Sequence, residues 1–379
     1  MKNSAPSSQI AKTTRRHAGI DIFRIVATLM VIMLHTLICT PLLSRSGVTT
    51  AHGSILWLFE TLCYCAVNCF AITSGFVSCQ STFKFSRLMR LWLEVFVIFI
   101  ICTLVWGKIA PDQLDDHAYR NMFFPILADL NWYFTAFFGM SLFSPFMNIM
   151  MKNLSKNQHK YLVILILILF CIPTRIPKVS DLFNLGGGYS MIWLCAMYIV
   201  GGYFRLHSTP ASDKRHLWLM GFFASGMVAW LYFTVVYDIT SSAYGEGKYY
   251  KIFLSYTSPF MVLMAICLLQ YFRNVTVKRG GRFISAVAAL TFGVFIFHTQ
   301  DLYWNLILET AVNFVSEKSP VITILGVIGI VFATFIICAV ATYVLSLLFR
   351  ITGLDKFCSF VHNKVFAKAN KMLQSDKEN

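Results

Sequence analysis

Two ionisable residues near the start of the chain, Arg24 and His35, lie in one apolar stretch, eleven positions apart. In an α-helix these positions differ by about 20° in direction and about 16 Å in height, so the two side chains share a face. Ionisable groups inside a membrane are costly, which makes them functional candidates, and an imidazole exchanges protons near neutral pH. Two plainer interpretations are that Arg24 reaches the membrane surface and pairs with Asp21, and that His35 is hydrogen-bonded to another helix.

A second group of candidates lies where the second apolar stretch ends and the third begins. Ser74 and Gly75 are small residues that let neighbouring backbones approach closely. Arg87 and Arg90 are three positions apart and therefore share a face at a helix start. Guanidinium groups bind phosphates through planar donors, although basic residues at this place are also the ordinary signal for a cytoplasmic segment. Glu94 is expected to pair with Arg90, one turn away.

A third group of candidates is expected near the outer membrane surface. Asn131 and Trp132 open the fourth apolar stretch, and His298 and Asp301 lie near the end of the ninth. His35 and His298 are each about 15 residues, or about 22 Å, from the inner start of their stretches, so they can share a level. We therefore expect an outer polar vestibule beside the histidines, while an interfacial aromatic belt explains Trp132 equally well.

The composition indicates which kind of element must hold these residues. Of the 379 residues, 57% are hydrophobic and 13% are charged, and the mean hydropathy is +0.65. Soluble domains carry about 25% charged residues, so the balance excludes an ordinary soluble enzyme and a disordered chain. The net charge of +15 would suggest nucleic acid in a soluble protein. In a membrane protein it indicates basic cytoplasmic loops instead, so no nucleic-acid partner is expected.

Apolar runs long enough to cross about 30 Å of hydrocarbon predict an all-α, polytopic membrane protein of about ten transmembrane helices. The predicted spans are 20–43, 54–79, 88–109, 129–150, 160–174, 189–206, 217–237, 249–272, 283–304 and 321–349. Lys and Arg concentrate in alternate connecting segments, which predicts that both termini lie in the cytoplasm. The expected location is the inner (plasma) membrane. The predicted organisation is a cytoplasmic tail over 1–19, a membrane domain over 20–350 and a basic, lipid-contacting tail over 351–379.

The cysteines and glycines suggest no further chemistry. The 11 cysteines lie almost all inside apolar stretches, and none shows metal-ligand spacing with histidines, so we expect neither a metal site nor disulfides. The run Gly186–Gly188 falls in a predicted outer loop without the strand and helix of a nucleotide-binding motif, and is interpreted as a turn or flexible lid.

The order of these motifs resembles the acyltransferase 3 family of integral membrane acyltransferases. The segment from Gly19 to His35 resembles the family's pattern of Arg, ten residues and His. Four further segments are similar to its second-helix Ser-Gly-Phe element, its Arg-x-x-Arg motif, its fourth helix and its late helix ending in histidine: Thr73–Phe76, Arg87–Arg90, Asn131–Phe134 with Ser144–Phe146, and Phe292–His298. The likeness runs in order over most of the chain.

The resemblance implies transfer of an acyl group, commonly acetyl from cytoplasmic acetyl-CoA, to a hydroxyl of a surface glycan or its lipid-linked precursor. On this basis Arg87 and Arg90, beside Ser74 and Gly75, would hold the CoA phosphates. Arg24 would guide the pantetheine arm toward the centre of the membrane.

The remaining candidates would then act on the acceptor. His35 would be the general base for the acceptor hydroxyl, or would carry the acyl group itself. His298 would orient the acceptor, stabilise charge or serve only a structural role. Asn131, Trp132 and Asp301 would face the acceptor. Acyl-CoA, the glycan and membrane lipids are the expected partners.

Two other classes of function remain open. A secondary transporter or glycan permease is one, because intramembrane Arg, His and carboxylates can relay protons. It would be expected to show internal repeats, yet the Arg24-to-His35 pattern has no second copy in the later half of the sequence. A non-catalytic sensor or assembly subunit is the other. Acyl transfer from acetyl-CoA to a glycan would distinguish the enzyme from both.

Overall fold

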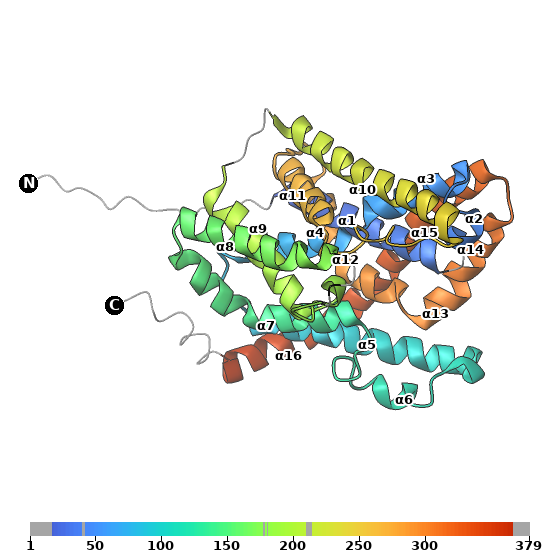
Figure 1. Cartoon of the computed structure of the whole chain (residues 1–379). Coiled ribbons are helices and arrows are strands. Elements are labelled where there is room, and N and C mark those ends of the chain that lie inside the picture. Colours follow the sequence, from blue (N-terminus) through green and yellow to red (C-terminus); the bar gives the residue numbers. More distant parts are fainter. Residues whose placement is uncertain (1–16, 40–41, 177–178, 180, 210–213, 367–379) are drawn as a thin grey trace, which may run out of the picture.

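The computed structural model describes residues 17–39, 42–176, 179, 181–209 and 214–366, and all regular structure in these ranges is helical (Figure 1). The first half of the chain forms α1 (Ala18–Ile38), α2 (Leu42–Ser46), α3 (Ala51–Cys63), α4 (Ala66–Ser78), α5 (Phe85–Ile109), α6 (Ala118–Asn121), α7 (Trp132–Asn153) and α8 (Lys156–Cys171). The second half forms α9 (Met191–His207), α10 (Arg215–Tyr244), α11 (Pro259–Arg273), α12 (Gly281–His298), α13 (Asp301–Tyr303), α14 (Glu309–Ser316), α15 (Pro320–Ile351) and α16 (Leu354–Val361). Short 3₁₀ or π turns occur at Pro111–Gln113, Pro173–Arg175, Gly186–Gly188, Trp304–Leu308 and His362–Phe366.

Eight helical segments of the described chain are long and apolar enough to cross a membrane. They are α1, α3 with α4, α5, α7, α8 with the turn that follows it, α10, α12 and α15. The prediction of an all-α, polytopic membrane protein is therefore confirmed, and each of the ten predicted spans contains a helix. The two others, α9 and α11, have only 17 and 15 residues.

The total of ten crossings and the cytoplasmic placement of both termini stay predictions. Most of the predicted N-terminal tail (1–16) and the end of the predicted C-terminal tail (367–379) lie outside the described residues.

The helices that form differ most from the predicted spans at two places. The span 249–272 becomes helical only at Pro259, because Tyr249 adopts a left-handed conformation with φ of 60° and the residues after it form turns. Proline then starts the helix, where its missing N–H costs nothing. The span 283–304 ends at His298, and a separate short helix begins at Asp301. Both segments are apolar enough to be mistaken for continuous helix.

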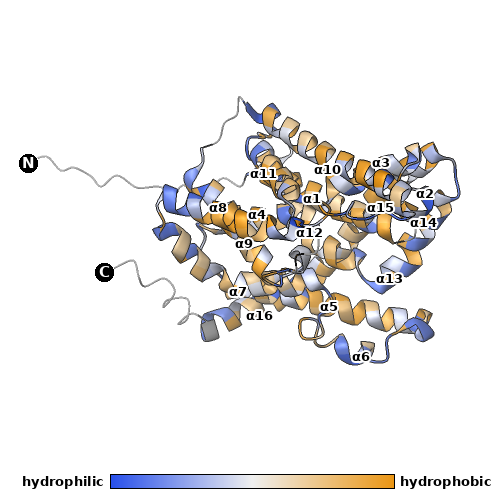
Figure 2. Cartoon of the chain, in the orientation of Figure 1, coloured by the Kyte–Doolittle hydropathy of each residue, from blue (hydrophilic) through white to orange (hydrophobic). Residues whose placement is uncertain are grey.

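Helix α1 lies in the middle of the bundle (Figure 1) and packs against α3, α4, α11, α12 and α15. Its side chains Phe23 and Ile32 are fully buried. Outward-facing positions of α10 and α15 are instead apolar and exposed, as at Ile239 and Ile336, and Figure 2 shows hydrophobic residues along the helix bodies. The helix that carries Arg24 and His35 is therefore surrounded by protein, whereas the peripheral helices present an apolar surface suited to lipid.

Helices α4 and α9 cross at a point where each helix has a glycine. A Cβ atom added at Gly75 would collide with the carbonyl oxygen of Tyr198, and one at Gly201 would collide with that of Ile72. Small residues at such a crossing allow close packing of membrane helices. The expectation that Gly75 permits close backbone approach is confirmed, and this contact fixes the position of α4 beside the candidate site.

Candidate active site

The two predicted histidines meet directly. His35 from α1 and His298 from α12 place their Nδ1 and Nε2 atoms 2.8 Å apart, and the ring centroids are separated by 5.0 Å. His298 is fully buried, and its Nδ1 lies 2.9 Å from the carbonyl oxygen of Val294, one turn earlier in α12. His35 is only half-buried, with the ring of Trp304 5.5 Å from its own.

These contacts assign the tautomers when both rings are neutral. A carbonyl oxygen only accepts hydrogen bonds, so the proton of His298 is on Nδ1 and its Nε2 carries a lone pair. Nδ1–H of His35 then donates to that lone pair. The remaining nitrogen of His35, Nε2, is left with a lone pair and makes no hydrogen bond to the described residues. The pair therefore presents one basic nitrogen of defined orientation.

A cavity of about 620 Å³, here called the basic chamber, opens around the N-terminal end of α1. It is lined by His17, Ile20, Asp21, Arg24, Phe76, Val77, Gln80, Ser81, Arg87 and Arg205. Arg24 is 3.7 Å from the buried carboxylate of Asp21, which also accepts a 2.5 Å hydrogen bond from Ser285. The predicted pairing with Asp21 is confirmed, yet Arg24 also faces a cavity, so the pairing does not exclude a binding role.

A second cavity, the aromatic channel, shares Arg24 with the basic chamber and has a volume of about 260 Å³. Its walls are Arg24, Phe70, Thr73, Ser74, Leu91, Tyr133, Phe137, Ala288, Ala289, Thr291, Phe292 and Phe295. The Phe295 ring lies 5.0 Å from Tyr133 and 5.8 Å from His298, so the wall of the channel touches the histidine pair. A narrower side pocket of about 160 Å³ shares Arg87 with the basic chamber and Leu91 with the channel.

A third cavity, the acidic chamber, has a volume of about 340 Å³ and is lined in part by the residues that directly follow His298 in the sequence. Its lining is Phe99, Cys102, Thr103, Trp106, Leu114, Asp115, Ala118, Asn121, Leu130, Thr299, Gln300, Asp301 and Leu302. Five residues between Ala288 and Phe295 line the aromatic channel and Thr299–Leu302 line the acidic chamber, so His298 falls between the two sets in the sequence. Neither His35 nor His298 lines any of the four cavities itself; the pair is reached through its neighbours, Phe295 of the aromatic channel and Thr299 of the acidic chamber.

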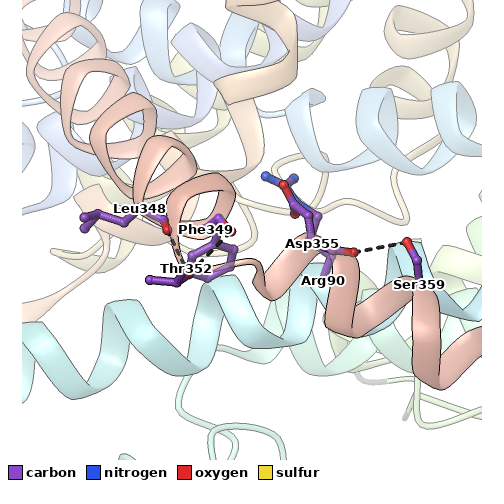
Figure 3. A network of polar contacts seen from close by, with 6 residues as sticks. All are labelled: Arg90, Leu348, Phe349, Thr352, Asp355 and Ser359. Carbon is purple, nitrogen blue, oxygen red and sulfur yellow. Dashed lines mark hydrogen bonds and ion pairs between the residues drawn. The ribbon is translucent and has the colours of Figure 1, made fainter.

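The two arginines of the Arg-x-x-Arg motif are separated in the structure. Arg87 lines the basic chamber, whereas Nε of Arg90 is 2.7 Å from the carboxylate of Asp355 in α16. Figure 3 shows Arg90 and Asp355 meeting between α5 and the C-terminal helix. The expected pair of Arg90 with Glu94 does not form in the described region, because α16 brings a carboxylate closer; Glu94 is buried beside α12 instead.

Ser74 and Gly75 also take different places. Ser74 lines the aromatic channel and donates a 2.9 Å hydrogen bond to the carbonyl of Phe70. Gly75 faces the backbone of α9 at the crossing described above and lines none of the four cavities. We therefore retain Ser74 as a donor-side candidate and interpret Gly75 as a packing residue.

The acceptor-side candidates are only partly brought together. Asn131 caps α7 by accepting from the Phe134 N–H at 3.0 Å, and it donates to Thr299 Oγ1 at 3.2 Å. Asp301 is exposed and lines the acidic chamber. Trp132 packs instead against other aromatic rings, 4.5 Å from that of Tyr189, and lines none of these cavities.

The structure adds residues that the sequence did not single out. Arg205, from the last turns of α9, joins Arg24 and Arg87 in the basic chamber, and Asp115 and Asn121 join Asp301 in the acidic chamber. Arg205 resembles any other basic residue at the end of an apolar stretch, so no signal in one sequence distinguishes it. In the described residues, no three His, Cys, Asp or Glu side chains gather as metal ligands.

Comparison with known proteins agrees with this geometry. Residues 17–343 match the model of acyltransferase 3, described as an acyltransferase domain, and this range contains α1, α12 and every residue that lines the four cavities. No match to the chain was found among curated proteins or among solved structures. Since the matched range covers most of the sequence and the helices are of membrane type, the chain belongs to the acyltransferase 3 family of membrane acyltransferases.

Proposed function

We propose that the protein transfers an acyl group, most simply acetyl, from cytoplasmic acyl-CoA to a hydroxyl of a cell-surface polysaccharide or its lipid-linked precursor. The observation that carries this proposal is the 2.8 Å contact of His35 with His298, in a stretch of chain whose preceding residues line the aromatic channel and whose following residues line the acidic chamber. An acyltransferase must bring a donor and an acceptor to one base, and two differently lined cavities, one bordered by Phe295 and the other by Thr299, are suited to that.

The donor fits the basic side. Phosphate groups are held by guanidinium forks, and the basic chamber is lined by arginines. The pantetheine arm then extends through the aromatic channel, whose one charged lining residue is Arg24. Arg24 and His35 are separated by about 16 Å along α1, an interval that an extended arm largely covers. The thioester thereby arrives beside the histidines.

The chemistry follows from the tautomers. Nε2 of His35 removes the proton of the acceptor hydroxyl while the oxygen attacks the thioester carbonyl carbon. The C–S bond then breaks, and the CoA thiolate takes the proton from the imidazolium, which returns His35 to its neutral form. During the charged stage Nδ1–H of His35 donates to His298, whose own Nδ1–H is held by Val294. His298 is thus a positioning residue that also stabilises the charge on His35.

The acceptor fits the acidic chamber. Its polar groups, Asp115, Asn121, Thr299 and Asp301, are hydrogen-bonding partners for hydroxyls, and Trp106 supplies an apolar face. Two carboxylates repel anions, so a neutral or amino-bearing sugar is favoured over a uronic acid. In the orientation predicted from basic residues, this chamber faces outward and the basic chamber faces the cytoplasm of a cell bounded by this plasma membrane.

The proposal is tested with the full chain in lipid nanodiscs, radiolabelled acetyl-CoA and an extract of envelope glycans. Wild type is expected to label the glycan, and His35→Ala to lower the rate by about 10²- to 10⁴-fold, the usual worth of a general base. Mass spectrometry of the product then identifies the sugar and hydroxyl. Uptake of a solute without any acyl transfer would overturn the proposal in favour of a transporter. An unchanged rate in His35→Ala would remove the base assignment.

A further inference from the structure

We propose that the phosphate site of the donor is built by Arg87 and Arg205, from two separate helices, and that Arg90 lies outside it. This inference rests on the proposed function only in naming acyl-CoA as the molecule that carries the phosphates. Arg205 is the residue it adds, and the ligand chemistry is an adenosine nucleotide bearing more than one phosphate group.

The guanidinium of Arg205 is held in place through its Nε and the face of its plane, and its terminal nitrogens are left available for a ligand. Its Nε donates to Gln80 Oε1 at 3.1 Å, and its guanidinium carbon lies 5.4 Å from the centroid of the Phe76 ring. Gln80 and Phe76 line the basic chamber themselves, so both contacts hold the guanidinium at the chamber wall. The two terminal nitrogens of Arg205 make no hydrogen bond to the described residues. A planar fork held at Nε with free terminal N–H groups is suited to bidentate phosphate binding.

The neighbouring Arg273, by contrast, uses its terminal nitrogens in hydrogen bonds within the protein. It lies against the same Phe76 ring, also at 5.4 Å, but its terminal nitrogens donate to Ser208 Oγ and Ser208 O at 2.8 Å and to Gln270 at 3.1 Å. Another of its bonds goes to the carbonyl of Phe204. Arg273 therefore ties the end of α9 to α11 and, through that end, keeps Arg205 in place.

Arg87 and Arg90 differ in the same way. Arg87 lines both the basic chamber and the side pocket, and its guanidinium makes no hydrogen bond or ion pair to the described residues. The side chain of Arg90 forms an ion pair with Asp355 through its Nε. Two arginines that look equivalent in the sequence thus divide into one that faces the cavity and one that holds the C-terminal helix.

The charge of the chamber indicates the ligand. Among the described residues that line the chamber, three are arginines, Arg24, Arg87 and Arg205, and one carries a carboxylate, Asp21, which lies 3.7 Å from Arg24. The unmatched charge therefore comes from Arg87 and Arg205, and it favours a polyanion. A volume of about 620 Å³ lies within the range of small-molecule sites. The donor is then recognised through its phosphates, and a thioester that lacks them binds weakly.

The test measures binding and turnover separately, on the full chain in lipid nanodiscs. The binding probe is adenosine 3′,5′-bisphosphate, which carries phosphates but no acyl group; the two donors are acetyl-CoA and phosphate-free S-acetylpantetheine. Arg205→Gln and Arg87→Gln are each expected to weaken bisphosphate binding and to raise KM for acetyl-CoA by about tenfold or more, as loss of a charged hydrogen bond predicts. KM for S-acetylpantetheine is expected to stay unchanged.

Controls make each outcome decisive. Lys160→Gln removes the same charge from an exposed site on α8 outside the chamber, and is expected to change neither quantity. Arg205→Lys keeps the charge without the fork and is expected to fall between wild type and Arg205→Gln. Undiminished bisphosphate binding in Arg205→Gln, or an equal rise of KM for both donors, overturns the inference. If the wild-type protein binds the bisphosphate but transfers no acyl group, the phosphate site is supported and the proposed function is wrong.

Discussion

His35 and His298 are 263 residues apart in the sequence, yet their ring nitrogens lie 2.8 Å apart, joining α1 to α12. The contact is directional, because the Val294 carbonyl fixes the proton on the far side of His298. It converts an intramembrane histidine that is ambiguous by itself into a base with one free nitrogen. A buried hydrogen bond across helices, the plainer interpretation of His35, is thus the same contact that supports a chemical role.

Because His298 acts through His35, its loss is expected to lower kcat more than it changes KM. His298→Ala is predicted to reduce kcat by about 100-fold, since His35 loses its tautomer and its charge partner together. The double variant with His35→Ala is expected to be no slower than His35→Ala alone, because residues that act as a unit are not additive. Steady-state kinetics on the four proteins check this. If the loss of kcat in the double variant were instead the product of the two single losses, the two histidines would act independently.

The ion pair of Arg90 with Asp355 is predicted to hold α16 against α5. Both side chains are 36% exposed, so the coupling should be modest, between about 0.2 and 1 kcal/mol. A double-mutant cycle of Arg90→Gln and Asp355→Asn, followed by thermal unfolding, measures it, and limited proteolysis of the segment after α15 reports the release of α16. If Arg90→Gln instead raised the donor KM as much as Arg87→Gln does, both arginines would contact the donor.

Local patterns in the sequence were sufficient for the helices and for faces on single helices. Arg24 and His35 share a side of α1 because helical geometry alone decides it, and apolar length located a helix in each predicted span. Local patterns were not sufficient at Tyr249 and Pro259, where turns carry residues as apolar as those of a helix. The hydropathy of a residue does not indicate whether the backbone at that residue forms a turn or a helix.

Contacts between segments that are distant in the sequence were the features that the sequence predicted least well. Nothing near Arg90 in the sequence indicates Asp355, 265 positions later, and nothing near α9 marks Arg205 as a cavity residue. Such contacts depend on which helices pack side by side, a property of the whole bundle. Motif resemblance treated Arg87 with Arg90, and Ser74 with Gly75, as equivalent pairs, which helix packing then separated.

The crossing of α4 and α9 predicts a large difference between two glycine substitutions. Gly75→Ala forces a Cβ into the carbonyl of Tyr198 and is expected to destabilise the protein by about 1–3 kcal/mol, the usual cost of overpacking. Gly329→Ala in α15 is the matched control, because its Cβ would meet nothing within 4 Å; it is expected to be neutral or stabilising by up to about 1 kcal/mol. Thermal unfolding in one detergent compares them. Equal unfolding temperatures would contradict the packing role of Gly75.

The aromatic channel predicts that its width limits the donor. Ala289 lines the channel and Ala286, one turn earlier on α12, does not, although both are exposed. Ala289→Phe places a ring where the pantetheine arm is expected to pass, so kcat/KM for acetyl-CoA should fall by about tenfold or more, as an obstruction costing 1–3 kcal/mol predicts. Ala286→Phe adds the same ring outside the channel and should leave kcat/KM near that of wild type. Binding of adenosine 3′,5′-bisphosphate should be unaffected in both variants, because that probe occupies only the basic chamber. A donor that passes elsewhere would make the two variants indistinguishable, and the path from Arg24 to His35 would then have to be sought along another face of α1.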